Sequence, residues 1–234
     1  MDRWFSQLDY EKESAKTRYF SDFALKHFGE MRILKKGGVL GKDNAEWRNV
    51  SEHCLVEAVG ADILCEYLGA DKEAVVTAVL LHDWHKRKEV EEMKKSGVVE
   101  GYVRAAEEND ELLRRYGLPD QIIKLTHANI PESNDPEYLS NRTLEEKIIH
   151  FVDMITSDSQ FIDFQTRLED VEKQELTVQF IESFRKKYGG HHLNEIQREA
   201  ATMEQEEFER ILNIQSNTLV HFIQEKLGER IGRS

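Results

Sequence analysis

A histidine and an aspartate, His82 and Asp83, stand side by side at the end of the apolar run of residues 74–81. Adjacent helical positions point about 100° apart, so these two side chains converge only on an object that lies beside the helix. His53 lies upstream of the pair and Asp153 lies downstream. Two imidazole nitrogens and two carboxylates suit a divalent cation, so this spacing predicts a metal centre.

An ion held by these four side chains keeps open positions for a water molecule and a phosphoryl oxygen. It can therefore polarise a phosphate ester and lower the pKa of the water, which predicts hydrolysis. Asp83 then serves both as a ligand and in catalysis. Because the carboxylates neutralise much of the ion's charge, other cations are expected near the phosphoryl oxygens, and Lys86 and Arg48 are the nearest in sequence. His85 could protonate the leaving group, since a histidine pKa lies near neutrality.

Each of these residues alone also has a structural interpretation. A single histidine on an apolar helix most often bonds a carbonyl, and Asp153 could pair with a buried arginine, because a buried carboxylate needs a partner. Lys86 could simply be a solvent-exposed side chain at a helix end. The joint spacing favours metal binding, with Glu52 or Glu57 as groups that could orient His53.

The elements that position these residues are predicted to be helices, because apolar spacing is helical almost throughout and no alternating strand pattern stands out. Ser51 is the predicted N-cap of the helix that carries His53. Asp71 is the predicted N-cap of the next helix, whose last turns carry the His-Asp pair. The ligands are therefore expected on rigid elements of an all-α fold.

Four more elements are predicted from the His-Asp pair to Asp153. Residues 97–117 have helical spacing, and Pro119 opens a short helix. Residues 129–141 form the one clear loop. Thr143 and Glu146 form a capping box, which starts the helix that carries Asp153.

The arrangement resembles the HD-domain metal-dependent phosphohydrolase superfamily, whose pattern is a His, a His-Asp pair and a distant Asp on separate helices. The resemblance covers residues 47–158 and carries over the four ligands named above. It implies an HD-domain helical bundle that hydrolyses phosphate esters with a divalent metal.

Two segments resemble particular branches of this superfamily. Residues 49–53 look like the first helix of the branch that contains nucleoside-monophosphate phosphatases, and residues 80–83 followed by Lys86 look like the His-Asp-x-Gly-Lys form. The chain departs from both. Lys86 stands where the nucleotidase branch has a proton-donating carboxylate, and His85 replaces the usual glycine.

The number of metals is less constrained by the sequence. Branches with two metals have additional histidines before the last Asp, and here only His127 and His150 are available. One divalent ion (Mn, Fe, Co, Ni, Zn or Mg) is expected, since histidine and carboxylate ligands accept all of these. A second ion held by His127 is the alternative.

The rest of the chain predicts a helical extension. Residues 161–187 and 193–227 have helical spacing with charged opposite faces, and we expect them to pack on the core as a helical hairpin or to form a homodimer interface. The expected domains are residues 1–158, an HD-type metal-binding domain, and residues 159–234, a long-helix extension.

Composition limits the partners. The chain has 234 residues and a formal net charge of −13, which disfavours a nucleic-acid surface. No uncharged apolar run approaches about 18 residues, so no membrane span is expected. Residues 1–10 lack the apolar core of a signal peptide, and Cys54 and Cys65 lie too far apart on one predicted helix to form a disulfide, so a cytoplasmic protein is expected.

The predicted function is metal-dependent hydrolysis of a phosphate ester or anhydride in a small, nucleotide-like molecule. A non-catalytic sensor or adaptor, in which a structural metal supports nucleotide binding, is the main alternative. Di-iron oxygenation on the same scaffold is a third possibility and would require His127 as a ligand.

Overall fold

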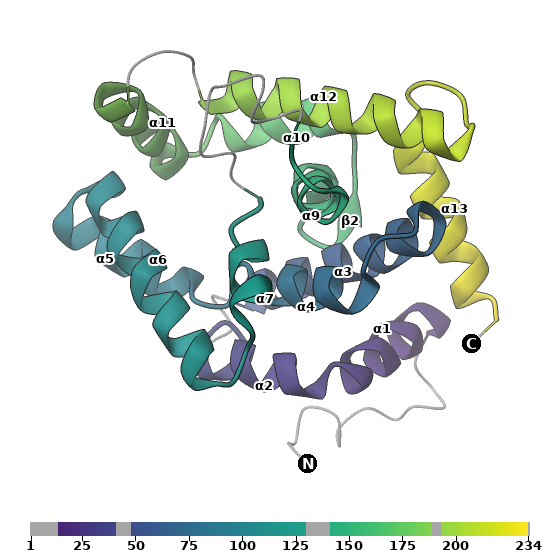
Figure 1. The fold of residues 1–234 in the computed structure, drawn as a ribbon, viewed down its shortest axis with the longest axis horizontal. Helices are drawn as coiled ribbons and strands as arrows, with labels where there is room; N and C mark the ends of the chain where they lie inside the picture. Colours follow the sequence, from purple (N-terminus) through teal and green to yellow (C-terminus); the bar gives the residue numbers. More distant parts are fainter. Residues whose placement is uncertain (1–13, 41–47, 130–140, 189–192, 234) are drawn as a thin grey trace.

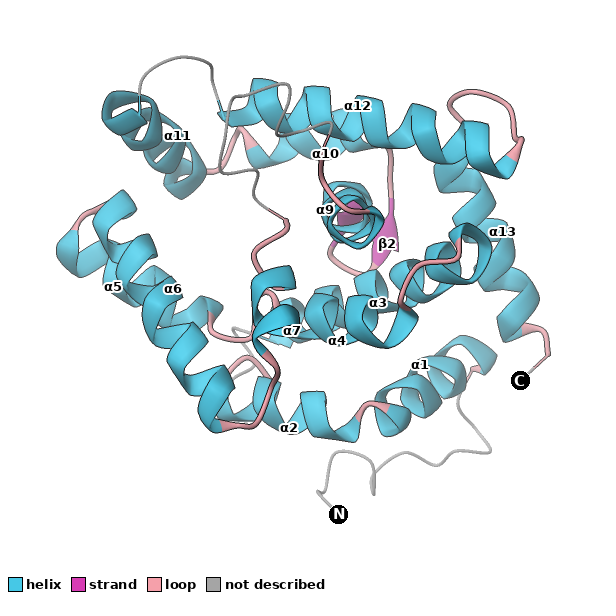
Figure 2. Cartoon of the chain, viewed as in Figure 1, coloured by secondary structure: helices cyan, strands magenta, loops and turns pink. Residues whose placement is uncertain are grey.

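The computed structural model describes residues 14–40, 48–129, 141–188 and 193–233. Over these ranges the chain is mostly helical, as Figure 2 shows, which confirms the all-α prediction. The exception is an antiparallel pair of two-residue strands, β1 (Thr156–Ser157) and β2 (Gln160–Phe161). Strands this short leave no alternating pattern in a sequence, which is why the prediction missed them. Most of the loop predicted at residues 129–141 lies outside the described residues.

The described helices, labelled as in Figure 1, are α1 (Ala15–Lys26), α2 (Phe28–Lys36), α3 (Arg48–Leu68), α4 (Lys72–Leu81), α5 (Lys86–Ser96), α6 (Val98–Arg115), α7 (Asp120–Leu125), α9 (Leu144–Ile155), α10 (Phe164–Val171), α11 (Glu175–Tyr188), α12 (Leu193–Leu212) and α13 (Leu219–Ile231).

Helix α9 runs through the middle of the molecule and is seen end-on in Figure 1. It packs against α3 and α4 on one side and against α10 and α12 on the other. One hydrophobic core joins these elements, with Leu80 of α4, Phe151 of α9 and Phe208 of α12 fully buried. The helices that carry the predicted ligands are therefore fixed by packing from both sides.

Local capping signals correctly predict where α4 and α9 begin. The Asp71 carboxylate accepts from the amide of Ala74 at 3.1 Å, so Asp71 is the N-cap of α4 as expected. Thr143 and Glu146 form the predicted capping box of α9. Helices α6 and α7 also lie where they were predicted.

Two boundaries near the predicted ligands differ from expectation. Helix α3 begins at Arg48, so Ser51 lies inside it and is not its N-cap. Serine is only weakly unfavourable within a helix, so its presence does not fix where a helix begins. Helix α4 ends at Leu81 with His82 as its C-cap, so the His-Asp pair lies in the turn after the helix and not in its last turns.

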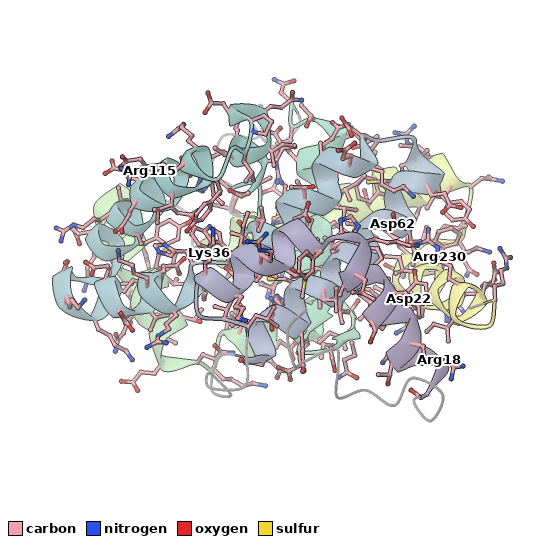
Figure 3. The ribbon with its side chains drawn as sticks, turned by 90° about the horizontal axis from the view of Figure 1, so that it is seen from below. Arg18, Asp22, Lys36, Asp62, Arg115 and Arg230 are labelled. Carbon is pink, nitrogen blue, oxygen red and sulfur yellow. The ribbon has the colours of Figure 1, made fainter. Side chains whose placement is uncertain are left out.

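Within the described residues, the C-terminal part contains four helices, α10 to α13, where two long ones were predicted. The second long segment breaks at Asn213 and Asn217, which have φ angles of 52° and 61°. Asparagine adopts this left-handed conformation more readily than most residues, and the break lets α13 return to α3. There Arg230 pairs with Asp62 and Glu66, and Figure 3 shows Arg230 beside Asp62. None of the described helices is long and apolar enough to cross a membrane.

Candidate metal centre and adjoining cavity

Four side chains from three helical segments meet between α3, the end of α4 and α9. One donor atom from each of His53, Glu57, His82 and Asp153 lies within 4.8 Å of every other. Three of these residues are predicted ligands. Glu57, which the sequence suggested only as an orienting group, takes the fourth place in the cluster.

Helix geometry explains two of the four positions. His53 and Glu57 are one turn apart on the same face of α3, and His53 Nε2 lies 2.7 Å from Glu57 Oε1. His82 Nδ1 lies 2.7 Å from the carbonyl oxygen of Val79, which directs Nε2 toward Glu57 Oε2 at 3.4 Å. A bond from the other ring nitrogen to a carbonyl is the usual way of holding a metal-binding histidine.

Asp153 is held by residues on either side. The Arg167 side chain of α10 donates to Oδ1 of Asp153 at 3.0 Å and to its carbonyl oxygen at 2.9 Å. The Asn129 amide donates to Oδ2 at 3.2 Å. His53 Nε2 lies 3.5 Å from Oδ1. Both carboxylate oxygens therefore have fixed positions next to the histidines.

The centre of this cluster has polar atoms that the protein does not satisfy. Glu57 is fully buried. Among the described residues, neither Glu57 oxygen nor His82 Nε2 has an aligned hydrogen-bond partner, although His53 comes close to Glu57. Unpaired buried groups of this kind are costly, and two imidazole nitrogens with two carboxylates fit a divalent cation. The residues present therefore suit a metal ion.

The charges of the cluster also favour a cation. Burial lowers the pKa of His53, but the carboxylates of Glu57 and Asp153 outweigh it and raise the pKa to about 10. Burial raises the pKa of Glu57 against the attraction of the two histidines. The negative groups therefore draw protons onto the histidines when no cation is bound, and a metal would displace those protons.

Asp83 lies at the edge of the cluster. Its Oδ2 is 3.8 Å from His82 Nε2, and its Oδ1 is 3.3 Å from Lys86 Nζ. Burial opposes ionisation of Asp83, but Lys86 and His82 bring its pKa below the usual value. The carboxylate is therefore charged and lies next to His82, but Asp83 is not one of the four residues whose donor atoms converge, so its role as a ligand stays a prediction.

A cavity of about 470 Å³ opens from the cluster. His53, Asp83 and Asp153 are among the residues that line it. Helices α5, α6, α10, α11 and α12 contribute much of the wall, which includes Tyr102 and Phe180 in edge-to-face contact with 5.3 Å between their ring centroids. A cavity of this size suits a small molecule.

Two basic side chains and one acidic side chain line the cavity close to the cluster. Lys86 and Arg167 both line the cavity. Burial lowers the pKa of Lys86, but Asp83 and Glu89 raise it well above the usual value, so Lys86 stays charged. Glu89 lies 3.0 Å from Lys86 and also lines the cavity. Burial raises the pKa of Glu89, although the charge of Lys86 opposes this rise.

The other predicted site residues lie elsewhere or outside the description. His85 lines a smaller cavity of about 30 Å³ together with His127, and its ring stacks on Trp84. Burial, followed by the charge of Lys88, lowers the pKa of His85. His127 Nε2 lies 2.7 Å from Asp110 Oδ1 and is not part of the donor cluster. The Arg48 side chain is outside the described residues.

Sequence reasoning missed Glu89 and Arg167 at this site and gave Glu57 only an orienting role. Glu57 is an acid on the buried face of α3 one turn from His53, and that position was a usable signal. Glu89 had a weaker one, a position one turn after Lys86. Arg167 had none, because its contact with Asp153 requires α10 to fold back on α9.

Residues 50–158 match the family described as the HD domain. The chain therefore carries an HD domain over these residues, as the resemblance in the sequence predicted. HD domains are typically metal-dependent phosphohydrolases, and the donor cluster of this chain is a candidate metal site within the domain. No curated protein and no solved structure shows a significant match to the chain.

Proposed function

We propose that this protein is a metal-dependent phosphohydrolase that cleaves a phosphate ester or anhydride of a small, nucleotide-like molecule. The observation that carries the proposal is the convergence of two imidazole nitrogens and two carboxylates within 4.8 Å, beside a cavity that His53 and Asp153 help to line. His53, Glu57, His82 and Asp153 would hold the ion, with Asp83 beside them. A divalent ion bound there supplies a Lewis acid for a phosphoryl oxygen and an activated water.

The two cations of the cavity suit a phosphate group. Arg167 has more N–H donors than its contacts with Asp153 use, and the nearby carboxylate of Asp83 raises the pKa of Lys86 and favours its charged form. In a site shielded from bulk water, such groups stabilise negative charge on phosphoryl oxygens more than they would in water. They would orient the phosphate toward the cluster.

Glu89 is a better proton donor than His85 in this proposal. A general acid must hold a proton near neutral pH, and burial raises the pKa of Glu89 while it lowers that of His85. Glu89 also lines the large cavity, whereas His85 lines the small one. Glu89 would thus take the role of the proton-donating carboxylate that the nucleotidase branch has at the position of Lys86, one helical turn earlier.

The test is an assay of phosphate release by the purified protein with Mn²⁺, Co²⁺ or Mg²⁺. The substrates are an aryl phosphate and a panel of nucleoside mono-, di- and triphosphates. Turnover is expected with at least one metal and should be lost after chelation. Asp83→Ala should abolish it, whereas Glu111→Ala, which removes an exposed carboxylate on α6, should leave it unchanged.

Two outcomes separate this proposal from its alternative. Nucleotide binding without turnover under every metal would favour a metal-supported sensor. Turnover that persists in Asp83→Ala would show that the activity comes from elsewhere. Elemental analysis of the same samples counts metals per chain and tests a second ion near His127.

A further inference from the structure

A second buried ionic cluster lies one helical turn from Asp153. Its centre is Glu204 of α12, which is 3% exposed. Glu204 Oε2 lies 2.6 Å from His150 Nδ1, and Oε1 accepts from Arg142 Nη1 at 2.7 Å. His150 is fully buried on α9, and Arg142 is buried in the segment that leads into α9.

Both arms of this cluster lead to Asp153. His150 precedes Asp153 by one turn on α9, so its contact with Glu204 fixes that part of the helix. Arg142 donates to the carbonyl oxygens of Ala128 and Glu146. Ala128 is followed directly by Asn129, whose amide holds Asp153 Oδ2 at 3.2 Å.

We infer that Glu204 is a positioning residue of the metal centre, which fixes Asp153 through His150 and through Arg142. Helix α12 lies beyond the matched HD domain of residues 50–158, so the C-terminal helices would form part of the working site. This inference rests on the proposed function, because it assumes that Asp153 binds a metal ion.

The expected effect follows from what Glu204 holds. Removing its charge leaves Arg142 buried without a carboxylate, so the segment with Ala128 and Asn129 must shift to regain partners. Groups that orient ligands typically change metal affinity by about 10–100-fold. Glu204 acts through intermediate residues, so we expect the lower end, about tenfold.

Helix α12 also provides a matched control. Glu209 is equally buried, 4% exposed, but accepts from the amides of Thr218 at 2.9 Å and Leu219 at 3.1 Å. It therefore supports the start of α13, and no described contact connects it with Asp153. Glu209→Gln should destabilise the fold without weakening metal binding.

The experiment compares the full-length wild type, Glu204→Gln and Glu209→Gln. Calorimetric titration with Mn²⁺ gives the metal affinity, and thermal unfolding of the metal-free proteins gives stability. Both variants should melt at lower temperature, but only Glu204→Gln should bind Mn²⁺ about tenfold more weakly. Wild-type affinity in Glu204→Gln, or equal weakening in Glu209→Gln, would overturn the inference.

Hydrogen exchange of the metal-free proteins keeps this test separate from the proposed function. Glu204→Gln should speed amide exchange in residues 126–129 and 150–155, and Glu209→Gln should not. If the wild type binds no Mn²⁺, the proposed function fails. If amide exchange in Glu204→Gln matches that of the wild type, the positioning role of Glu204 fails as well. Should Glu204→Gln not fold, His150→Gln breaks only the α9 arm and is compared in the same way.

Discussion

Two buried glutamates, Glu57 and Glu204, each lie next to a histidine but differ in their hydrogen bonding. Glu57 on α3 lies between His53 and His82, and Glu204 on α12 lies between His150 and Arg142. Each is almost completely buried, and each comes from a different helix than at least one of its neighbours. The two clusters are only one turn of α9 apart, since His150 belongs to one and Asp153 to the other.

The difference lies in how well each carboxylate is satisfied. Both oxygens of Glu204 make short contacts, at 2.6 Å and 2.7 Å, with groups that can donate to them. Within the described part of the chain, neither oxygen of Glu57 has an aligned partner. A satisfied buried acid holds helices together, whereas an unsatisfied one costs free energy that a bound cation would recover. This contrast separates the metal centre from its support.

The largest expected effects come from neutralising each glutamate in turn. Glu57→Gln should weaken Mn²⁺ binding by about 100-fold. It should lower the unfolding free energy of the metal-free protein by less than Glu204→Gln does, because the attraction lost between Glu57 and the protonated histidines is offset by no longer burying a carboxylate without an aligned partner. Glu204→Gln should lower that free energy by about 3–5 kcal/mol, because Arg142 is left buried and uncompensated. Urea unfolding and Mn²⁺ titration measure both quantities.

The contrast breaks down in either of two ways. If Glu57→Gln destabilises the metal-free protein as much as Glu204→Gln does, both acids are structural. If Glu57→Gln binds Mn²⁺ like the wild type, Glu57 lies outside the metal centre and Asp83 alone completes the ligand set.

The stability of the metal-free protein and its affinity for Mn²⁺ should depend on pH in opposite directions. The folded-state pKa of His53, about 10, exceeds its unfolded value of 6.5. Its stabilisation of the metal-free protein is therefore fully present below pH 6.5 and is lost as the pH rises toward 10. A metal requires neutral histidines, so Mn²⁺ affinity should instead rise with pH, by about tenfold per unit for each proton displaced.

Melting temperatures measured between pH 6.5 and 8.5, with and without Mn²⁺, show both pH trends. His221→Asn, which removes an exposed histidine on α13, should leave both trends unchanged. A metal-induced shift in melting temperature that stays constant over this range would contradict proton displacement at His53 and His82.

The parts of the fold that the sequence predicted correctly depend on local signals. Asp71 at the start of α4 and the Thr143–Glu146 box at the start of α9 satisfy backbone groups within a few residues of themselves. The apolar runs of α3, α4 and α9 likewise reflect burial, which in α4 and the second half of α9 extends around most of the helix. Such features are readable without knowing the tertiary structure.

The parts that were missed depend on contacts distant in sequence. An acid on a buried helix face, such as Glu57, has no defined role until His82 arrives from another helix. Arg167 reaches Asp153 only because α10 folds back on α9, and Glu204 meets His150 across 54 positions. The break between α12 and α13 rests on two asparagines whose left-handed φ no periodicity encodes.

The smallest expected effect tests the His82 side of the metal centre. Gly37 ends α2 against the turn after α4, where an added Cβ would lie 1.8 Å from the Trp84 carbonyl oxygen. Gly37→Ala must displace that turn and should cost about 1–3 kcal/mol of unfolding free energy. Gly29→Ala on the same helix meets nothing within 4 Å and should instead stabilise by up to about 1 kcal/mol.

Because the turn carries His82 and Asp83 but no residue of the Glu204 cluster, Gly37→Ala should also weaken Mn²⁺ binding while leaving amide exchange at residues 126–129 unchanged. Equal stability of the two alanine variants would show that the turn adapts without strain and that the His-Asp pair does not depend on α2.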